Sequence, residues 1–424
     1  ILAYWILRNL TKLTRPMHKT IISGPEHNKN RLKKRLLHQL YMVGQASVPQ
    51  MARMLGVSIP TVKNLMVELL ESDEVKSAGI GESNGGRKPE LYELQCGRFH
   101  IVACDMGRYE ATMAIYNCRN QQVGKGLKIR TNYDDPDLID KLVGNFYRII
   151  RENDLGIQHI YGFGIDMPGL IDSKHGINYT IKNRKNQNIR KALEKHISTY
   201  IYIDNDARMQ AFGELRFGKA KGKKDVIRVH WSWGLGLGMI LDGKLYSGST
   251  GFAGELSHIK LEDGGELCIC GKRGCLETEG SATSLMREVR KGVMQNVVSV
   301  LTTRYKDNPD AITPEIVIDA ARAGDEFAIL QLNHIGMALG KGLSILIQLL
   351  NPEIIIIGGP LSAARQFVLT PVQQALNRYC LEKISQNIPV EISELDENAG
   401  LLGVTACLFD TIFSENHTMK HIMG

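Results

Sequence analysis

Residues Gly254–Glu279 read GELSHIKLEDGGELCICGKRGCLETE and concentrate metal-binding side chains on one short stretch. Cys268, Cys270 and Cys275 fall within eight residues, and His258 lies ten residues before the first of them. Three cysteines and one histidine are a standard tetrahedral ligand set for structural Zn²⁺, so we predict zinc here. The spacing departs from the common C-x₂-C, and a cluster of reduced thiols or a redox pair is the alternative.

The same stretch carries two carboxylates that zinc does not need. Glu255 precedes His258 by three residues, and Glu277 follows Cys275 by two. If a metal fixes the loop, both acids are held near the imidazole, and paired carboxylates are good acceptors for the hydroxyls of a sugar. The alternative is that both are solvated loop acids.

The pattern E-x-x-H followed by C-x-C-G-x-x-G-C-x-E resembles the signature of the ROK family (repressors, open reading frames and sugar kinases). The matching positions are Glu255, His258, Cys268, Cys270, Gly271, Gly274, Cys275 and Glu277. The resemblance extends over about residues 97–410. It implies that His258 and the three cysteines bind zinc, and that Glu255, His258 and Glu277 face a sugar.

The short apolar segment Ile201–Ile203, which is predicted to be a strand, is followed by Asp204-Asn205-Asp206. A carboxylate between a strand and a helix, such as Asp206, can accept the proton of a hydroxyl. The resemblance implies that Asn205 contacts the sugar and that Asp206 also contacts it, with a catalytic role only if the protein is a kinase. The alternative is that Asp206 caps the following helix.

Two loops depart from the phosphate-binding pattern of ROK kinases. The kinase loop D-x-G-G-T-K corresponds to Asp105–Glu110 (DMGRYE), and the second loop, G-T-G-x-G, corresponds to Ser232–Gly236 (SWGLG). Glycine permits close approach of phosphate to the backbone, and bulky or acidic residues replace small ones in both loops. We therefore expect no kinase activity, although the turn Gly358-Gly359-Pro360 leaves weak nucleotide binding open.

Length and composition describe an ordinary folded protein. The 424 residues suggest two or three domains. Eight cysteines without a secretory signal argue against a disulfide framework and for a cytoplasmic protein without membrane contact. The apolar opening ILAYWIL is too short to span a membrane. Because the chain begins with Ile, we expect residues 1–27 to be a tail that is in part not native, with Met17 as a plausible start.

The positive charge is confined to the amino-terminal part of the chain. Residues 1–100 hold 15 Lys and Arg and 8 Asp and Glu. Residues 101–424 hold 37 basic and 37 acidic residues, so their net charge is zero. A basic module on a neutral body indicates a polyanionic partner such as DNA, and a solvated basic tail is the alternative.

Three helical segments, 28–43, 48–55 and 59–72, follow one another in this basic region. The third has an apolar face of Val62, Leu65, Met66, Leu69 and Leu70. Its polar side, with the preceding turn, offers Ser58, Thr61, Lys63 and Asn64. This arrangement is typical of a helix-turn-helix, and we predict that these four residues contact operator DNA.

A Gly-rich basic segment follows between two short strand-like runs, 75–80 and 90–94. Its tip, GESNGGRKP, places Arg87 and Lys88 where a wing would contact phosphate or the minor groove. The G-G-R-K-P turn also resembles the wing of ROK repressors. The alternative is a three-helix protein-interaction module with a flexible hairpin.

The remaining chain alternates between α and β, with buried-type strands at 99–105, 162–165, 201–203 and 353–357 and helices at 136–153, 281–306, 327–350 and 400–414. The fold class is α/β. The resemblance implies a two-lobed, actin-like (ribonuclease-H-type) ROK domain. We predict a winged helix-turn-helix at 28–95 and a ROK domain at 97–424, with lobes of about 97–207 plus the C-terminal helix, and about 208–400.

These observations predict a sugar-responsive transcriptional regulator, most simply a repressor of carbohydrate-metabolism genes, acting as a homodimer or homotetramer. Its predicted partners are operator DNA and a sugar or sugar-derivative effector. An ATP-dependent sugar kinase with an accessory DNA-binding module is the alternative, and a structural protein with a vestigial sugar cleft is a third interpretation. The sequence names neither the sugar nor the operator.

Overall fold

The computed structural model describes residues 25–82, 88–182, 187–395 and 397–414. An amino-terminal module contains α2 (Pro25–Val43), α3 (Val48–Leu55) and α4 (Ile59–Glu71). It also contains a three-stranded sheet in the order β1-β3-β2, built from β1 (Gln45–Ser47), β2 (Val75–Ile80) and β3 (Glu90–Leu94). Three helices and this sheet form a winged helix-turn-helix, as the sequence predicts. Residues 1–24, which include Met17, lie outside the described residues.

Local signals place the helix-turn-helix. Ser47 and Gln50 form a reciprocal capping box at the start of α3, with the Ser47 amide donating to Gln50 Oε1 at 2.8 Å. Gly56 ends α3 in the left-handed conformation, at φ 69°, and Ser58 caps α4 through its hydroxyl. The predicted apolar face of α4 is buried except at Leu70, which is 40% exposed and therefore not part of the core.

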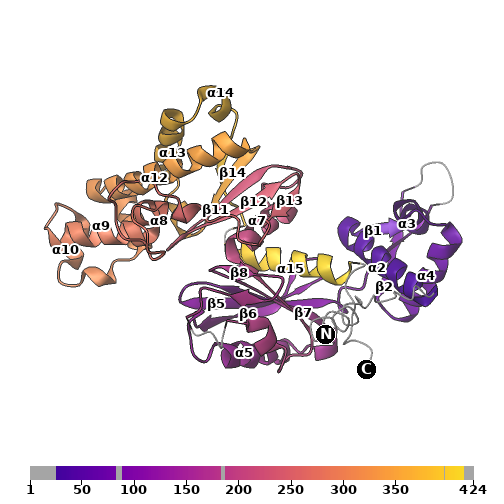
Figure 1. Ribbon diagram of the computed structural model, residues 1–424. Coiled ribbons are helices and arrows are strands. Elements are labelled where there is room, and N and C mark those ends of the chain that lie inside the picture. The colour runs from indigo at the N-terminus through magenta and orange to yellow at the C-terminus, as the bar shows by residue number, and fades with distance from the viewer. Residues whose placement is uncertain (1–24, 83–87, 183–186, 396, 415–424) are drawn as a thin grey trace, which may run out of the picture.

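The body consists of two lobes, each built on a five-stranded mixed sheet (Figure 1). Lobe 1 has the order β10-β7-β4-β5-β6 and lobe 2 the order β13-β12-β11-β14-β15. The strands of lobe 1 are β4 (His100–Met106), β5 (Glu110–Asn117), β6 (Gln122–Arg130), β7 (Ile160–Met167) and β10 (Tyr200–Asn205). The strands of lobe 2 are β11 (Val226–Trp231), β12 (Leu235–Leu241), β13 (Lys244–Tyr246), β14 (Ile354–Gly358) and β15 (Val390–Ile392).

The two sheets share one topology. In each, the first strand pairs antiparallel with the second and parallel with the fourth, and the fourth pairs parallel with the fifth. This repeated order confirms the actin-like, two-lobed α/β fold that the resemblance implied.

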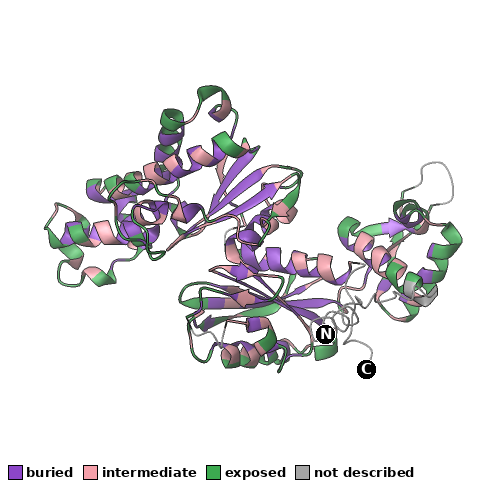
Figure 2. Ribbon diagram, viewed as in Figure 1, coloured by how far each residue is buried: buried purple, intermediate pink, exposed green. Residues whose placement is uncertain are grey.

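Helices cover both sheets. Helix α5 (Leu138–Glu152) and the short α6 (Ile189–Leu193) bury apolar side chains with one face of the lobe 1 sheet. On lobe 2, α8 (Leu276–Gly280), α9 (Ala282–Met294), α11 (Pro314–Arg322), α12 (Glu326–Leu350) and α13 (Gln366–Tyr379) share the largest core with β11, β12 and β14. Figure 2 shows that buried residues follow the sheets and the inner faces of these helices.

Two helices pack tightly against each other at the centre of the body (Figure 1). Helix α7 (Asp206–Phe217) contacts α15 (Asn398–Ile412) so closely that a Cβ at Gly403 would lie 1.8 Å from the Met209 carbonyl oxygen. Helix α7 approaches lobe 2 equally closely, because a Cβ at Gly238 would lie 2.4 Å from the Ala207 carbonyl oxygen. The pair therefore connects both lobes.

The structure corrects several expected elements. The segment 281–306 is not one helix: α9 ends at Met294, and α10 (Val300–Tyr305) is separate. Asn296 adopts φ 57° between them, a left-handed conformation that asparagine tolerates and that stops a helix. Sequence periodicity missed β1, β6, β15 and α13. The proposed limits of domains and lobes stay predictions, and no helix among the described residues has the length and apolar character needed to cross a membrane.

Candidate functional site

A cavity of about 1770 Å³ lies between the lobes. Residues from both lobes line it, including every residue predicted to contact sugar: Asn205, Asp206, Glu255, His258 and Glu277. Its wall also includes both loops that differ from the kinase pattern. The fold therefore brings together side chains that lie more than 70 positions apart in the sequence.

The four predicted zinc ligands lie together at one side of this cavity. The ligand atoms of His258, Cys268, Cys270 and Cys275 are all within 4.8 Å of one another. Nδ1 of His258 lies 3.5 Å from Sγ of Cys268, and Sγ of Cys270 lies 3.6 Å from Sγ of Cys275. Tetrahedral Zn²⁺ with Zn–S bonds near 2.3 Å needs sulfurs about 3.8 Å apart, so this donor set fits zinc.

The backbone holds the sulfurs in place. The Cys268 amide donates to the Lys272 carbonyl at 2.8 Å, and the Gly271 amide returns to the Cys268 carbonyl at 2.9 Å. Gly274 adopts φ 74°, and a Cβ there would lie 1.8 Å from the Glu262 carbonyl oxygen. Only glycine fits at position 274, which explains one of the glycines between the cysteines.

His258 connects the cysteine cluster to the acids of the cavity. Its Nδ1 faces the cysteines, while its Nε2 lies 3.9 Å from Oε2 of Glu255. Burial raises the pKa of Glu255 and Glu277, and the nearby His258 opposes the shift in both. Glu277 also accepts a hydrogen bond from the Leu235 amide. A metal bound at Nδ1 would fix the His258 ring. Its Nε2 would then be held between the carboxylates of Glu255 and Glu277.

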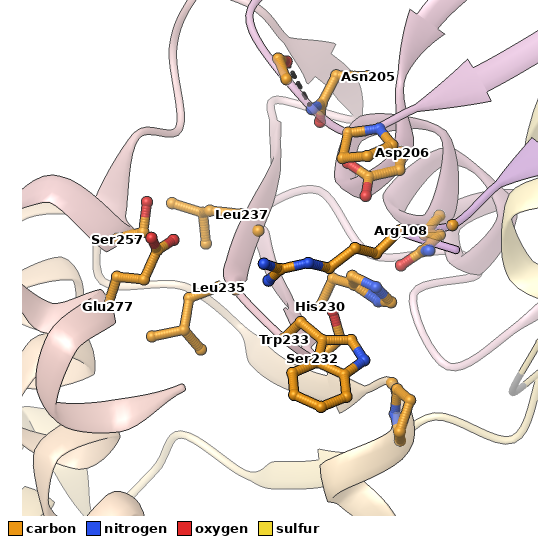
Figure 3. A pocket seen from close by; sticks show the side chains of 18 of the residues that line it. Arg108, Asn205, Asp206, His230, Ser232, Trp233, Leu235, Leu237, Ser257 and Glu277 are labelled. Carbon is orange, nitrogen blue, oxygen red and sulfur yellow. Dashed lines mark hydrogen bonds between the residues drawn. The ribbon is translucent and has the colours of Figure 1, made fainter. Parts of the chain in front are cut away.

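Asn205 and Asp206 lie at the junction of β10 and α7, facing the cavity from lobe 1 (Figure 3). Asn205, rather than Asp206, is the helix cap: its Oδ1 accepts the Arg208 amide at 3.2 Å, and its Nδ2 donates to the Gly169 carbonyl at 3.2 Å. Asp206 also takes part in the first turn, because its Oδ1 accepts the Ala207 amide at 2.8 Å. Burial raises the pKa of Asp206, which suits a group that exchanges protons with a hydroxyl.

Arg208 was not predicted as a site residue. It is 3% exposed, its Nε donates to Oδ1 of Asp204 at 2.7 Å, and its guanidinium also donates to the carbonyls of Ile171 and Gly251. The bond to Gly251 fixes the segment that leads to Glu255. The sequence signal for this residue is an arginine four positions after an aspartate, a spacing at which the two side chains can pair.

The two altered phosphate loops contact each other across the cavity. Tyr109, after β4, and Trp233, after β11, have ring centroids 6.0 Å apart in an edge-on arrangement. The Arg108 guanidinium carbon lies 5.5 Å from the centroid of Tyr109 and 5.8 Å from that of Trp233. Figure 3 shows Arg108 extending across the cavity above Trp233. These three residues form an aromatic bridge between the lobes.

A second acidic pair lies beneath the cavity. A Cβ at Gly400, at the start of α15, would lie 2.5 Å from Oδ2 of Asp166 and 2.8 Å from Oδ2 of Asp105. Burial raises the pKa of Asp105 to about 6 and that of Asp166 further still. Burial is the main cause of both shifts, and for Asp166 the neighbouring Asp105 carboxylate adds to it, so this site favours the protonated form of an acid. Sequence reasoning used Asp105 only as a loop marker and missed Asp166.

The predicted DNA contacts lie on one exposed surface of the module. Ser58, Thr61, Lys63 and Asn64 are all exposed on α4 and the turn before it. The hydroxyls of Ser58 and Thr61 lie 2.8 Å apart and bond to each other. Lys88 is exposed at the base of the wing, and Arg87 lies outside the described residues.

The module packs against lobe 1 where α7 and α15 end. The Tyr41 ring, on α2, lies 5.2 Å from Phe409 on α15, and the Arg216 guanidinium carbon, at the end of α7, lies 5.4 Å from the centroid of the same ring. Arg216 also pairs with Asp410 at 2.5 Å. Sequence reasoning missed this junction, because its partners are separated by more than 170 residues.

Comparisons with known proteins agree with this architecture. A sequence model described as the ROK family matches residues 101–411. The chain is 29% identical to the xylose repressor of Caldicellulosiruptor bescii, over 86% of this chain and 92% of that protein. It is 34% identical to a glucokinase of Halalkalibacterium halodurans, over 71% of this chain and 92% of that protein.

Among solved structures, a ROK family transcriptional regulator described as a homologue of the Escherichia coli Mlc protein has a similar fold. It has a TM-score of 0.79 and 24% identity, covering 94% of this chain and 100% of its own. The xylose repressor matches 86% of this chain, whereas the glucokinase matches 71%.

Proposed function

Because the chain belongs to the ROK family, we propose that it is a DNA-binding transcriptional repressor whose affinity for its operator is set by a sugar. The observation that carries this proposal is the junction of a winged helix-turn-helix and a sugar-type cleft in one chain, joined by α7 and α15. The xylose repressor resembles the chain over 86% of its length, which is more than the ROK match at residues 101–411 alone. A repressor of carbohydrate genes is the function that both parts support.

The sugar is proposed to bind between the lobes. Asn205 and Asp206 from lobe 1, and Glu255, His258 and Glu277 from lobe 2, supply hydrogen-bond acceptors and donors around one space. Zn²⁺ on His258 and the three cysteines would supply no chemistry to the sugar. It would hold the loop that carries His258 between the two glutamates.

Nucleotide use is disfavoured at the aromatic bridge. In a kinase, backbone amides of the two loops approach the phosphates closely. Here the side chains of Arg108, Tyr109 and Trp233 contact one another between those loops. Trp233 is also fixed to lobe 2, because its carbonyl accepts the Thr283 hydroxyl at 2.7 Å. These side chains, and the Glu110 carboxylate in the same loop, would compete with phosphates for the space between the loops.

Signal transmission is proposed to pass along α7 and α15. Helix α7 begins at the sugar site with Asp206 and ends with Arg216 on the Tyr41 ring of the module. Helix α15 begins against Asp105 and Asp166 and ends with Phe409 beside the same ring. A change in lobe closure that tilts this rigid pair would shift α2, and with it the paired α4 helices of a dimer on the operator.

Two measurements test the proposal: the change in Tm on adding each ligand, and the release of bound DNA by the same ligand. The protein is screened against sugars, sugar phosphates and ATP, and DNA selected from a random duplex library provides the operator probe. We expect one sugar class to raise the Tm by mass action and to release the selected DNA, and ATP to do neither. Glu277→Gln should abolish both sugar effects without weakening DNA binding, whereas Glu279→Gln, two residues on, should preserve them.

A sugar kinase is the second candidate, favoured by Asp206 at the cavity and by the 34% identity to a glucokinase. A coupled assay for ADP release with the sugar panel decides between the two. Turnover that Asp206→Asn abolishes would support the kinase and overturn the proposal of a pure regulator. Sugar binding without turnover supports the repressor.

A further inference from the structure

Two cysteines outside the metal cluster lie in contact at the junction of module and lobe 1. Cys96 is in the connection between β3 and β4, and Cys118 is in the turn between β5 and β6. Their Sγ atoms are 3.1 Å apart, and they are separated by 22 positions in the sequence. A disulfide needs sulfurs at about 2.05 Å, so a movement of about 1 Å would bring them to bonding distance.

The surroundings of the pair favour oxidation at Cys96. Cys118 is buried at 4% exposure, while Cys96 is half-buried and thus open to a small oxidant. Cys118 donates a hydrogen bond to the Cys96 sulfur, and this bond, with Arg119 and Lys76, outweighs the opposing effects of burial and Glu93 and lowers the pKa of Cys96 to about 7. The thiolate is the nucleophilic form of cysteine.

Other contacts at the same turn join the two parts of the chain. The Tyr41 hydroxyl donates to Oδ1 of Asn120 at 2.9 Å, and the Arg119 guanidinium pairs with Glu93 on β3 at 2.5 Å. Glu93 is 6% exposed, whereas the Arg119 side chain is 50% exposed, so the ion pair lies at the rim of the contact. The cysteine pair lies beside these contacts, and a bond between the sulfurs would join module and lobe covalently.

We propose that Cys96 and Cys118 are an oxidisable dithiol, and that their disulfide fixes the amino-terminal module to lobe 1. The oxidant is hydrogen peroxide. The Cys96 thiolate attacks one peroxide oxygen, the O–O bond breaks, and a sulfenic acid and hydroxide form, and the hydroxide takes a proton from solvent to become water. The Cys118 sulfur then attacks the sulfenic sulfur and a second water leaves. The two thiols lose two electrons and the peroxide gains them.

Peptide mapping of the full-length protein tests the chemistry without DNA or sugar. The zinc-supplemented protein is treated with hydrogen peroxide, alkylated, digested with trypsin and analysed by mass spectrometry. We expect a cross-linked product of the peptides that end at Arg98 and Arg119, which disappears after dithiothreitol. The half-buried Cys380 and Cys407 serve as internal controls and should be recovered as alkylated peptides.

Backbone hydrogen exchange tests the structural consequence. We expect oxidation to slow exchange at residues 95–98 by about tenfold or more in the wild type and to leave it unchanged in Cys118→Ser. Cys96→Ser provides a second variant should the buried substitution unfold the protein. Recovery of the 96–118 product at no higher yield than products of Cys380 or Cys407 would overturn the proposal, as would unchanged exchange in fully cross-linked protein. Neither readout depends on the proposed function.

Discussion

Asp105 illustrates at the scale of one residue how the fold sets chemistry. Its carboxyl lies against Gly400 and beside Asp166, and burial raises its pKa from 3.8 to about 6. The folded state therefore holds a proton that the unfolded chain releases above about pH 4. The stability associated with this proton is fully present below the unfolded pKa and is lost as the pH rises through the folded pKa.

Asp105→Asn should consequently stabilise the protein at pH 8 and not at pH 4. The amide is similar in shape to the carboxyl and cannot ionise. Because the pKa of Asp105 is raised from 3.8 to about 6, removing its charge should increase the free energy of unfolding at pH 8 by at most about 3 kcal/mol. Thermal unfolding at both pH values measures this. Asp263→Asn, at an exposed loop acid, is the control. An equal change in Tm at pH 4 and pH 8 would contradict the linkage.

Lys63 is the residue at which the DNA interface is most directly testable. It is exposed on α4 beside Asn64 and lies on the surface that would face phosphate. Lys63→Ala should weaken binding to selected DNA severalfold and reduce the slope of log affinity against log salt by about 1. Lys306→Ala, on lobe 2, should change neither quantity. An unchanged salt slope in Lys63→Ala would place the DNA on another surface.

At the scale of elements, we expect the loop between η3 (Leu256–His258) and α8 to be ordered by its four candidate metal ligands rather than by its own packing. Leu267 and Ile269 are 61% and 88% exposed, so this segment buries few apolar side chains. Its order is expected to come from the metal, as in small zinc-dependent modules.

Removal of the metal should therefore disorder the sugar site and leave the module intact. With one such cluster among the residues that the structure describes, we expect about one zinc per chain by elemental analysis, and a chelator should lower the Tm by several degrees and abolish sugar binding. Zinc should restore both and Mg²⁺ neither. Cys270→Ser should behave like the chelated protein and Cys380→Ser like the wild type. Full sugar binding without zinc would refute this role of the loop.

At the scale of the whole molecule, α7 and α15 connect two sites that the sequence keeps apart. Close backbone contacts at Gly213, Gly403 and Gly238 make the pair a rigid body against both lobes. Its far end contacts Tyr41, so the relative position of the lobes and the position of the module are mechanically linked.

Arg216→Ala should separate sugar binding from DNA release. The substitution removes the contact with Tyr41 and the ion pair with Asp410, both outside the cavity. The sugar should still raise the Tm, while the ratio of DNA affinities without and with sugar should fall about fivefold or more, the usual range of allosteric coupling. Lys219→Ala, which loses pairs with Glu391 and Glu394 in lobe 2, is the matched control. A normal ratio in Arg216→Ala would exclude this route.

Sequence alone determined the local features of this protein. The cluster of His258 with three cysteines, the helices of the amino-terminal module and the strands of the wing follow from residue types at short spacing, because a turn, a short helix or a metal-binding loop is stabilised by its own neighbours. The two-lobed fold came from the family resemblance, since apolar strands do not encode the order in which they pair.

Only the tertiary structure decided which distant residues meet. The contact of Tyr109 with Trp233, the position of Asp105 and Asp166 beside Gly400, and the junction of Tyr41 with Arg216 and Phe409 join residues from separate elements. Such contacts depend on how whole sheets and helices pack. Each arises from many small packing interactions along the chain, and no local pattern at either partner records the other.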